Sequence, residues 1–182
     1  MKNYFVITGG PGSGKTTLAE ALQAQGMICM PEAGRAIIRD QMAIAGTALP
    51  WADRASFAEQ MLGWEMRSHH EAGRHGKAPV VFDRGIIDVI GYLRHCGLPV
   101  PGHAARAASL FRYHPFVFVA PPWPAIYVQD AERRQDADEA AATCRAMEDA
   151  YRAHGYSPIA LPLAPVAARI AFVRDHVARW QA

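Results

Sequence analysis

Cysteine is scarce in this sequence, which has three, Cys29, Cys96 and Cys144, among 182 residues. The number is odd and the spacing fits neither a metal site nor a redox motif, so we expect reduced thiols in a reducing compartment. The chain also lacks an apolar run of the roughly 18 residues that a membrane helix needs. Its first residues read as a strand and not as a signal peptide. These absences predict a cytoplasmic protein with no membrane partner.

An excess of one charge is missing as well. Lys and Arg number 19 against 17 Asp and Glu, which gives a net charge of +2. No basic stripe with interleaved aromatic residues is present, so nucleic acid is not an expected partner. The composition is 51% hydrophobic, enough for a buried core. We therefore expect one domain over residues 1–182 that binds a small molecule, and the sequence gives no indication of its oligomeric state.

Strand-like and helix-like segments alternate along the chain. The β-prone runs lie at 4–8, 27–30, 79–83, 116–120 and 159–163. Helical patterns lie at 14–26, 33–45, 53–73, 88–96, 103–113 and 137–153, and a last one follows Pro165. In the third helical pattern Ser56 and Glu59 match a capping box. This alternation predicts an α/β fold of three layers, with a five-stranded parallel sheet between helices.

The first strand-like run ends in a glycine-rich turn that carries the strongest motif. Gly9, Gly10, Pro11, Gly12, Ser13, Gly14, Lys15 and Thr16 match G-x-x-x-x-G-K-[ST] between a predicted strand and a predicted helix. Glycines let backbone N–H groups turn toward phosphate oxygens, and the helix adds the positive end of its dipole. We expect this loop, with Thr17, to bind nucleotide. Lys15 would contact the β- and γ-phosphates, and Thr16 would help to hold Mg²⁺. A flexible glycine turn is the alternative, but it does not explain the Lys-Thr pair.

Asp83 ends the third β-prone run, where a parallel sheet presents its ligand-binding edge. A carboxylate there suits a second partner for Mg²⁺, commonly reached through a water molecule. The alternative is that Asp83 caps the helix that follows it.

Several short segments together resemble a known family. They are the phosphate loop, Pro31-Glu32-Ala33-Gly34-Arg35, Val81-Phe82-Asp83-Arg84-Gly85, Pro121-Pro122-Trp123-Pro124 and Glu132-Arg133-Arg134-Gln135. The chain from Phe5 to about Val173 is similar to the AAA-labelled P-loop proteins related to ribosylnicotinamide kinase, and more distantly to the deoxynucleoside kinases. The resemblance implies a nucleoside/nucleotide kinase-like fold, with the second strand at the sheet edge, the third beside the first, and a short arginine-bearing lid at about 121–138.

The resemblance also implies roles for individual residues. Glu32 would be the general base or the anchor of the substrate hydroxyl, Asp83 the magnesium partner, and Arg84 a contact to phosphate or substrate. Arg133 and Arg134 would be catalytic lid residues. The Asp-Arg-Gly segment here departs from the Glu-Arg-Ser of deoxynucleoside kinases, so their nucleoside specificity does not transfer.

Most of these residues could instead have a purely structural role. Glu32 could serve only as a negative charge at a helix N-terminus. Arg133 and Arg134 could form a solvated helix face. Arg35 lies one helical turn after Glu32, where it could pair with that carboxylate or bind an anionic substrate. The histidines at 69, 70 and 75 lack a completing cysteine or acidic pair, and a solvated surface is expected for them.

The sequence therefore predicts an ATP-binding P-loop enzyme that uses Mg²⁺ to transfer the γ-phosphoryl group to a hydroxyl of a nucleoside-like or other small acceptor. The alternative is an ATPase or GTPase switch with slow hydrolysis. The GTPase form is disfavoured because no [NT]-K-x-D motif follows the fourth strand. A ring-forming motor does not fit the length, and the L-S-G-G-Q segment of transporter ATPases is missing.

Overall fold

A computed structural model describes residues 3–126 and 137–181 of the chain. Its strands form one sheet in the order β2-β3-β1-β4-β5, and every neighbouring pair is parallel. The strands are β1 (Tyr4–Gly9), β2 (Ile28–Met30), β3 (Val80–Asp83), β4 (Phe116–Ala120) and β5 (Ser157–Ala160). The expected five-stranded parallel sheet is confirmed, with β2 at an edge and β3 beside β1.

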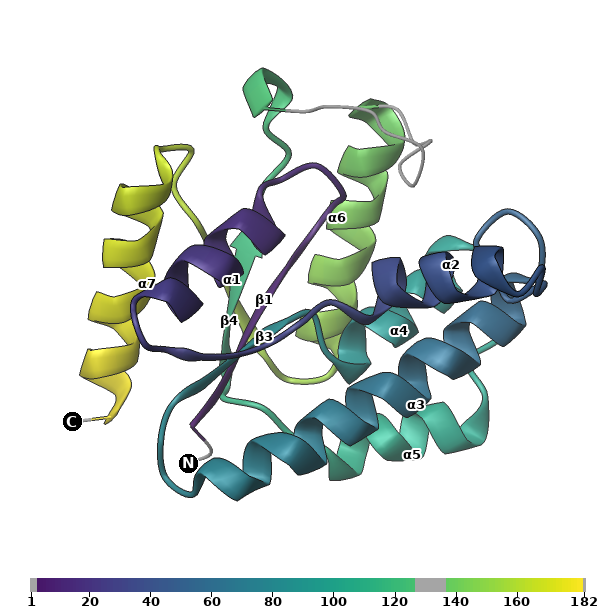
Figure 1. Cartoon of the computed structure of the whole chain (residues 1–182), viewed down its shortest axis with the longest axis horizontal. Helices are drawn as coiled ribbons and strands as arrows, with labels where there is room; N and C mark the ends of the chain where they lie inside the picture. Colours follow the sequence, from purple (N-terminus) through teal and green to yellow (C-terminus); the bar gives the residue numbers. More distant parts are fainter. Residues whose placement is uncertain (1–2, 127–136, 182) are drawn as a thin grey trace.

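Helices cover both faces of this sheet (Figure 1). They are α1 (Lys15–Ala24), α2 (Ala33–Ala43), α3 (Arg54–Ala72), α4 (Ile86–His95), α5 (Gly102–Leu110), α6 (Ala137–Ala153) and α7 (Val166–Gln181). Two short 3₁₀ turns, η1 (Gly73–His75) and η2 (Pro124–Ile126), complete the described elements. Within the described residues, no helix combines the length and apolarity that crossing a bilayer requires.

Alternate residues of β1 explain the two hydrophobic layers. Phe5 and Ile7 pack in one cluster with α1 and α7, while Val6 packs in the other with α2 to α6. Successive side chains of a strand point to opposite faces, so a strand buried on both faces needs a continuous apolar run. The sheet is thereby held between two apolar layers, which fixes the carboxyl ends of its strands relative to one another.

Three local expectations are wrong. The last strand spans Ser157–Ala160 and not 159–163, because the Ser157 N–H already pairs with the Pro115 carbonyl (2.7 Å) and Pro158 is tolerated on an edge strand. Helix α3 is capped by the Asp53 carboxylate, which accepts from the Ser56 N–H (2.9 Å), so the Ser56–Glu59 capping box does not form.

His69 is the third error, since it is buried and not solvated. Its ring stacks edge-on against Tyr4 and Phe111, and Nε2 lies 3.1 Å from the Arg112 carbonyl oxygen. It follows Leu62 by seven residues, a spacing that places both side chains on the same face of α3.

Candidate functional site

The glycine-rich loop joins the end of β1 to the start of α1. Gly12 and Gly14 both have φ of 74°, a left-handed conformation that glycine adopts without strain. At Gly9 a Cβ atom would overlap the Ala120 carbonyl oxygen at the end of β4. The glycines at these positions therefore allow the turn and the close approach of two strands.

Lys15, at the first position of α1, is only 5% exposed. Its Nζ donates hydrogen bonds to the Gly10 carbonyl (2.6 Å) and to the Ser13 Oγ (3.3 Å). Burial, aided by the nearby Arg84 cation, lowers the pKa of Lys15 to about 8. The ammonium group is thus held inside the loop and bonded to the loop itself.

Arg169 of α7 supports the same loop from another element and is not predicted from the sequence. Its side chain is fully buried, and one guanidinium nitrogen donates to the Ser13 carbonyl (3.0 Å). The guanidinium carbon lies 5.8 Å from the centre of the Trp123 ring. Arg169 lies three residues after Val166 and four before Val173, so it shares a helix face with two apolar residues. A charged residue on an apolar face is the feature of the sequence that could have indicated its burial.

Thr16 and Asp83 meet at the end of β3. The Thr16 hydroxyl donates to Asp83 Oδ2 at 3.0 Å, and Asp83 is 1% exposed. The other carboxyl oxygen, Oδ1, is buried with no hydrogen-bond partner among the described residues. Burial, and then the negative charge of Glu32, raise the pKa of Asp83 to about 6. The N-cap of α4 is Gly85, so Asp83 is not a helix cap.

Arg84 follows Asp83 and links three parts of the site. Its guanidinium donates to Glu32 Oε1 (2.8 Å), to the Gly9 carbonyl (3.1 Å) and to Asp88 Oδ1 (3.3 Å). The residue has φ of 77°, a left-handed conformation that costs a non-glycine residue about 1 kcal/mol or more. These bonds and the surrounding packing hold that conformation, which directs the side chain toward the glycine-rich loop.

Glu32 lies at the N-cap position of α2, but its side chain makes no capping hydrogen bond. It pairs with Arg84, and its second oxygen lies 3.9 Å from Arg35 Nε. Burial works against ionisation of Glu32, but the Arg84, Lys15 and Arg35 cations outweigh it and hold the pKa at about 2. Glu32 is therefore ionised throughout the neutral range.

Asp88, on the first turn of α4, accepts a hydrogen bond from the Arg84 guanidinium. It is not predicted as a site residue from the sequence. Its Oδ2 accepts from the Gly85 N–H (3.0 Å) and from the Tyr151 hydroxyl of α6 (2.7 Å). Its Oδ1 accepts from the Thr8 hydroxyl and from Arg84. A buried carboxylate with so many donors is a rigid support, so Asp88 positions Arg84.

The structure thus brings together Lys15, Thr16, Glu32, Asp83 and Arg84 at the carboxyl ends of β1 to β3. Thr17 is exposed on α1. Arg133 and Arg134, with most of the expected lid, lie outside the described residues. In the part of the chain that the structure describes, no group of three or more His, Cys, Asp or Glu is arranged to hold a metal ion.

A hollow of about 520 Å³ runs along the edge strand β2 and reaches Pro31, the residue before Glu32. Its walls come from the end of α1, from β2 and from α3, and include Met27, Trp64 and His75. None of the predicted site residues lines it, so we do not assign it to the candidate site.

Comparison with known proteins places this geometry among P-loop folds. A family model described as an AAA domain matches residues 4–169. Thymidylate kinase from Ehrlichia chaffeensis is similar in structure, with a TM-score of 0.63, 17% identity and coverage of 96% of this chain and 97% of that one. Deoxyadenosine kinase from M. mycoides, with products dCMP and a flexible dCDP bound, has a TM-score of 0.62, 10% identity and coverage of 97% and 99%.

A NadR protein in complex with NR has a TM-score of 0.72 and 15% identity. The alignment covers 97% of this chain but 50% of the NadR chain, so this protein spans half of that one. No curated protein matches the sequence significantly. At these identities the solved structures show a common fold, the one seen in nucleoside and nucleotide kinases.

Proposed function

We propose that this chain, which belongs to the AAA domain family of P-loop proteins, is an ATP-dependent kinase for a small-molecule acceptor. It would transfer the γ-phosphoryl group of ATP to a hydroxyl group. The observation that carries the proposal is the Glu32–Arg84 ion pair (2.8 Å), whose guanidinium also binds the Gly9 carbonyl at the loop. A carboxylate held at this place can orient the nucleophile of phosphoryl transfer, and phosphorylation of an acceptor distinguishes a kinase from an ATPase, whose nucleophile is water.

The loop residues 9–17 would bind the ATP phosphates. Backbone N–H groups and the N-terminus of α1 suit anionic oxygens, and Lys15 would exchange its bonds to the loop for bonds to the β- and γ-phosphates. The Thr16 hydroxyl and the unpartnered Oδ1 of Asp83 fit Mg²⁺, directly or through water. When bound with ATP, that ion would offset negative charge on the phosphates.

The acceptor hydroxyl would lie between Glu32 and the γ-phosphorus. Its oxygen forms a bond to the γ-phosphorus as the bond to the β–γ bridging oxygen breaks, and ADP leaves. The hydroxyl proton passes to the Glu32 carboxylate. Little charge builds on the attacking oxygen in the loose transition state, so a carboxylate with a pKa of about 2 serves by orienting the hydroxyl and by taking its proton late.

The arginines supply positive charge around the transferred group. Arg84 would contact phosphate or acceptor while its other donors keep Glu32 and Asp88 in place. We further propose that residues 1–182 form one kinase-like domain, in which Arg133 and Arg134 of a lid at about 121–138 add charge in the closed state. Arg35, beside Glu32, would contact the acceptor.

The test is phosphoryl transfer from Mg·ATP to a panel of nucleosides, vitamins and sugars. Glu32→Gln is expected to lower kcat by roughly a hundredfold or more and to leave the Kd for ATP nearly unchanged, because the amide oxygen can still accept from Arg84 while the basic carboxylate is lost. Lys15→Ala should weaken ATP binding severely. The matched control is Glu20→Gln on the exposed side of α1, which should behave as the wild type.

Two results would overturn the proposal. One is ATP binding with no modification of any panel member, accompanied by slow hydrolysis, which would favour the nucleotide switch. The other is an unchanged kcat in Glu32→Gln, which would return Glu32 to a structural role at the start of α2.

A further inference from the structure

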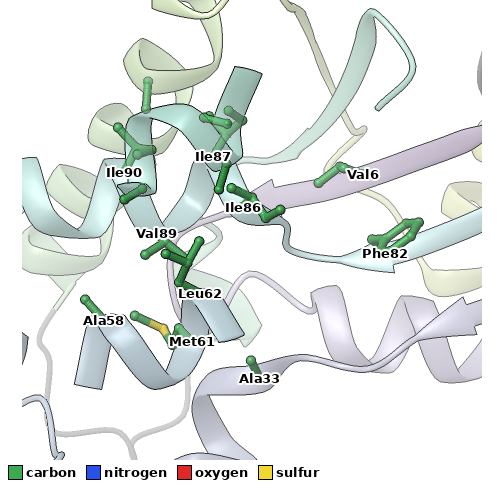
Figure 2. Close-up of a cluster of buried hydrophobic side chains, with 14 of the residues drawn as sticks. Val6, Ala33, Ala58, Met61, Leu62, Phe82, Ile86, Ile87, Val89 and Ile90 are labelled. Carbon is green, nitrogen blue, oxygen red and sulfur yellow. The ribbon is translucent and has the colours of Figure 1, made fainter. Parts of the chain in front are cut away.

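Helix α3 carries a buried carboxyl group that the proposed mechanism does not use. Glu65 is 3% exposed, and it follows Met61 by one helical turn. Met61 and Leu62 pack in one cluster with Ala33 at the start of α2 and Phe82 in β3 (Figure 2). Residues three and four apart share a helix face. Glu65 therefore lies on the face of α3 directed toward the segments that carry Glu32 and Asp83.

Glu65 has no donor to its carboxyl group among the described residues, in contrast to Asp88, which accepts four hydrogen bonds. The carboxyl oxygens of Glu65 are not among the fully enclosed polar atoms of the described residues, so a group that arrives from solvent can reach them. An apolar residue at position 65 would continue the core of α3. A glutamate at this position is instead accounted for by a ligand group that donates hydrogen bonds to it.

The charges near Glu65 restrict what that ligand group can be. Burial raises the pKa of Glu65 well above its usual range, the Asp88, Asp83 and Glu32 carboxylates raise it further, and the Arg84 cation opposes them. The Arg84 guanidinium is already bonded to two of these carboxylates. A ligand N–H or cationic group that donates to Glu65 would favour its charged form, whereas the Asp83, Asp88 and Glu32 carboxylates nearby would repel a phosphate dianion.

We propose that Glu65 is a second acceptor-binding carboxyl group, which receives hydrogen bonds from the acceptor and selects an unphosphorylated, donor-rich alcohol over a phosphate monoester. The inference rests on the proposed kinase function for the identity of the site. This inference adds the chemical class of the acceptor and names Glu65 as the residue that recognises the acceptor. Glu32 would hold the hydroxyl that reacts, and Glu65 would bind hydroxyl or amino groups elsewhere on the same molecule.

The experiment compares matched pairs of ligands by calorimetry, with the full chain saturated by a non-hydrolysable ATP analogue and Mg²⁺. The pairs are alcohols with their phosphate monoesters, such as adenosine with adenosine 5′-monophosphate and ribose with ribose 5-phosphate. We expect the unphosphorylated member of the productive pair to bind at least about tenfold more tightly. Tighter binding of the monoester overturns the proposal, as does failure of every unphosphorylated member to bind.

Two variants test Glu65 itself. Glu65→Gln keeps the shape, and Glu65→Met removes the polar atoms; both should weaken acceptor binding about tenfold or more and leave ATP affinity unchanged. Glu65→Met should also keep or raise the Tm, because an unpartnered carboxyl is removed. A purely structural role predicts a lower Tm with unchanged acceptor affinity, and that result overturns the proposal. Glu71→Gln, on the exposed side of α3, is the matched control.

The same measurements separate this inference from the kinase proposal. If monoesters are phosphorylated in preference to their alcohols, the kinase function stands and the role of Glu65 fails. If alcohols bind in a Glu65-dependent manner but receive no phosphoryl group, the role of Glu65 stands and the kinase function fails.

Discussion

Lys15 carries the positive charge inside the glycine-rich loop, and its burial lowers its pKa to about 8. At pH 8 a group with that pKa is about half deprotonated. The phosphates of ATP are anionic at this pH and would favour the charged form of the amine. Binding of ATP should therefore be coupled to proton uptake by Lys15. Protons are taken up and not released because the bound phosphates raise the pKa of Lys15.

We expect uptake of up to about half a proton per ATP at pH 8, seen by calorimetry without Mg²⁺ in buffers of different ionisation enthalpy. The observed binding enthalpy should change with the buffer for the wild type. Lys15→Arg is the control, since a guanidinium does not titrate at this pH and its binding enthalpy should not depend on the buffer. A wild-type enthalpy that is the same in all buffers would contradict the prediction.

Residues differ in how far the sequence alone identifies them. Lys15 and Thr16 follow from a motif with fixed spacing, and Glu32 and Arg84 follow from short segments that resemble a family. Asp88 and Arg169 do not stand out, because a charged residue in an amphipathic helix normally faces water. Their burial depends on donors and acceptors that come from distant parts of the chain, such as Tyr151 and Ser13.

The contact between α4 and α6 fixes Asp88, the residue that positions Arg84. Asp88 on α4 accepts a hydrogen bond from the hydroxyl of Tyr151 on α6. Gly91 lies one turn further along α4. A Cβ at Gly91 would approach the Met147 Sδ to 2.7 Å and the Met147 Cα to 3.2 Å. The absence of a side chain at Gly91 therefore sets the distance between the two helices.

The prediction compares two identical substitutions in two helices. Gly91→Ala should lower the free energy of unfolding by about 1–2 kcal/mol, because overpacking against α6 outweighs the gain in helix propensity. Gly63→Ala on α3, where a Cβ would meet nothing within 4 Å, should raise it by about 0.5–1 kcal/mol. Urea unfolding measures both, and equal effects of the two substitutions would contradict the packing argument.

The elements themselves were predictable where the apolar pattern was long. The alternation of strands and helices predicts the sheet, and residues 137–153 are helical as expected. The expected position of the last strand is wrong because Ile159 to Leu163 is the more apolar run, whereas pairing with β4 begins at Ser157. An edge strand is defined by the hydrogen bonds of its neighbour, and composition alone does not encode that register.

At the scale of the whole molecule, the glycine-rich loop is tied to both layers around the sheet. Arg169 of α7 holds the Ser13 carbonyl from one layer, and Asp88 of α4 holds Arg84, which binds the Gly9 carbonyl, from the other. A loop fixed from two sides loses less conformational entropy when it binds phosphate. Nucleotide binding should consequently stabilise the fold as a whole.

A non-hydrolysable ATP analogue with Mg²⁺, at about 100 times its Kd, should add about 2.7 kcal/mol of stability by mass action. For a chain of this size that corresponds to a rise in Tm of about 5–11 °C, measured by thermal denaturation. Arg169→Met removes the tie to Ser13 and should weaken binding about tenfold, so its Tm should rise by about 3–5 °C less at the same ligand concentration. Arg174→Met replaces an exposed arginine of the same helix and should retain the full shift. Equal shifts in both variants would mean that α7 does not preorganise the loop, and the support of the site would then rest on the α4 side alone.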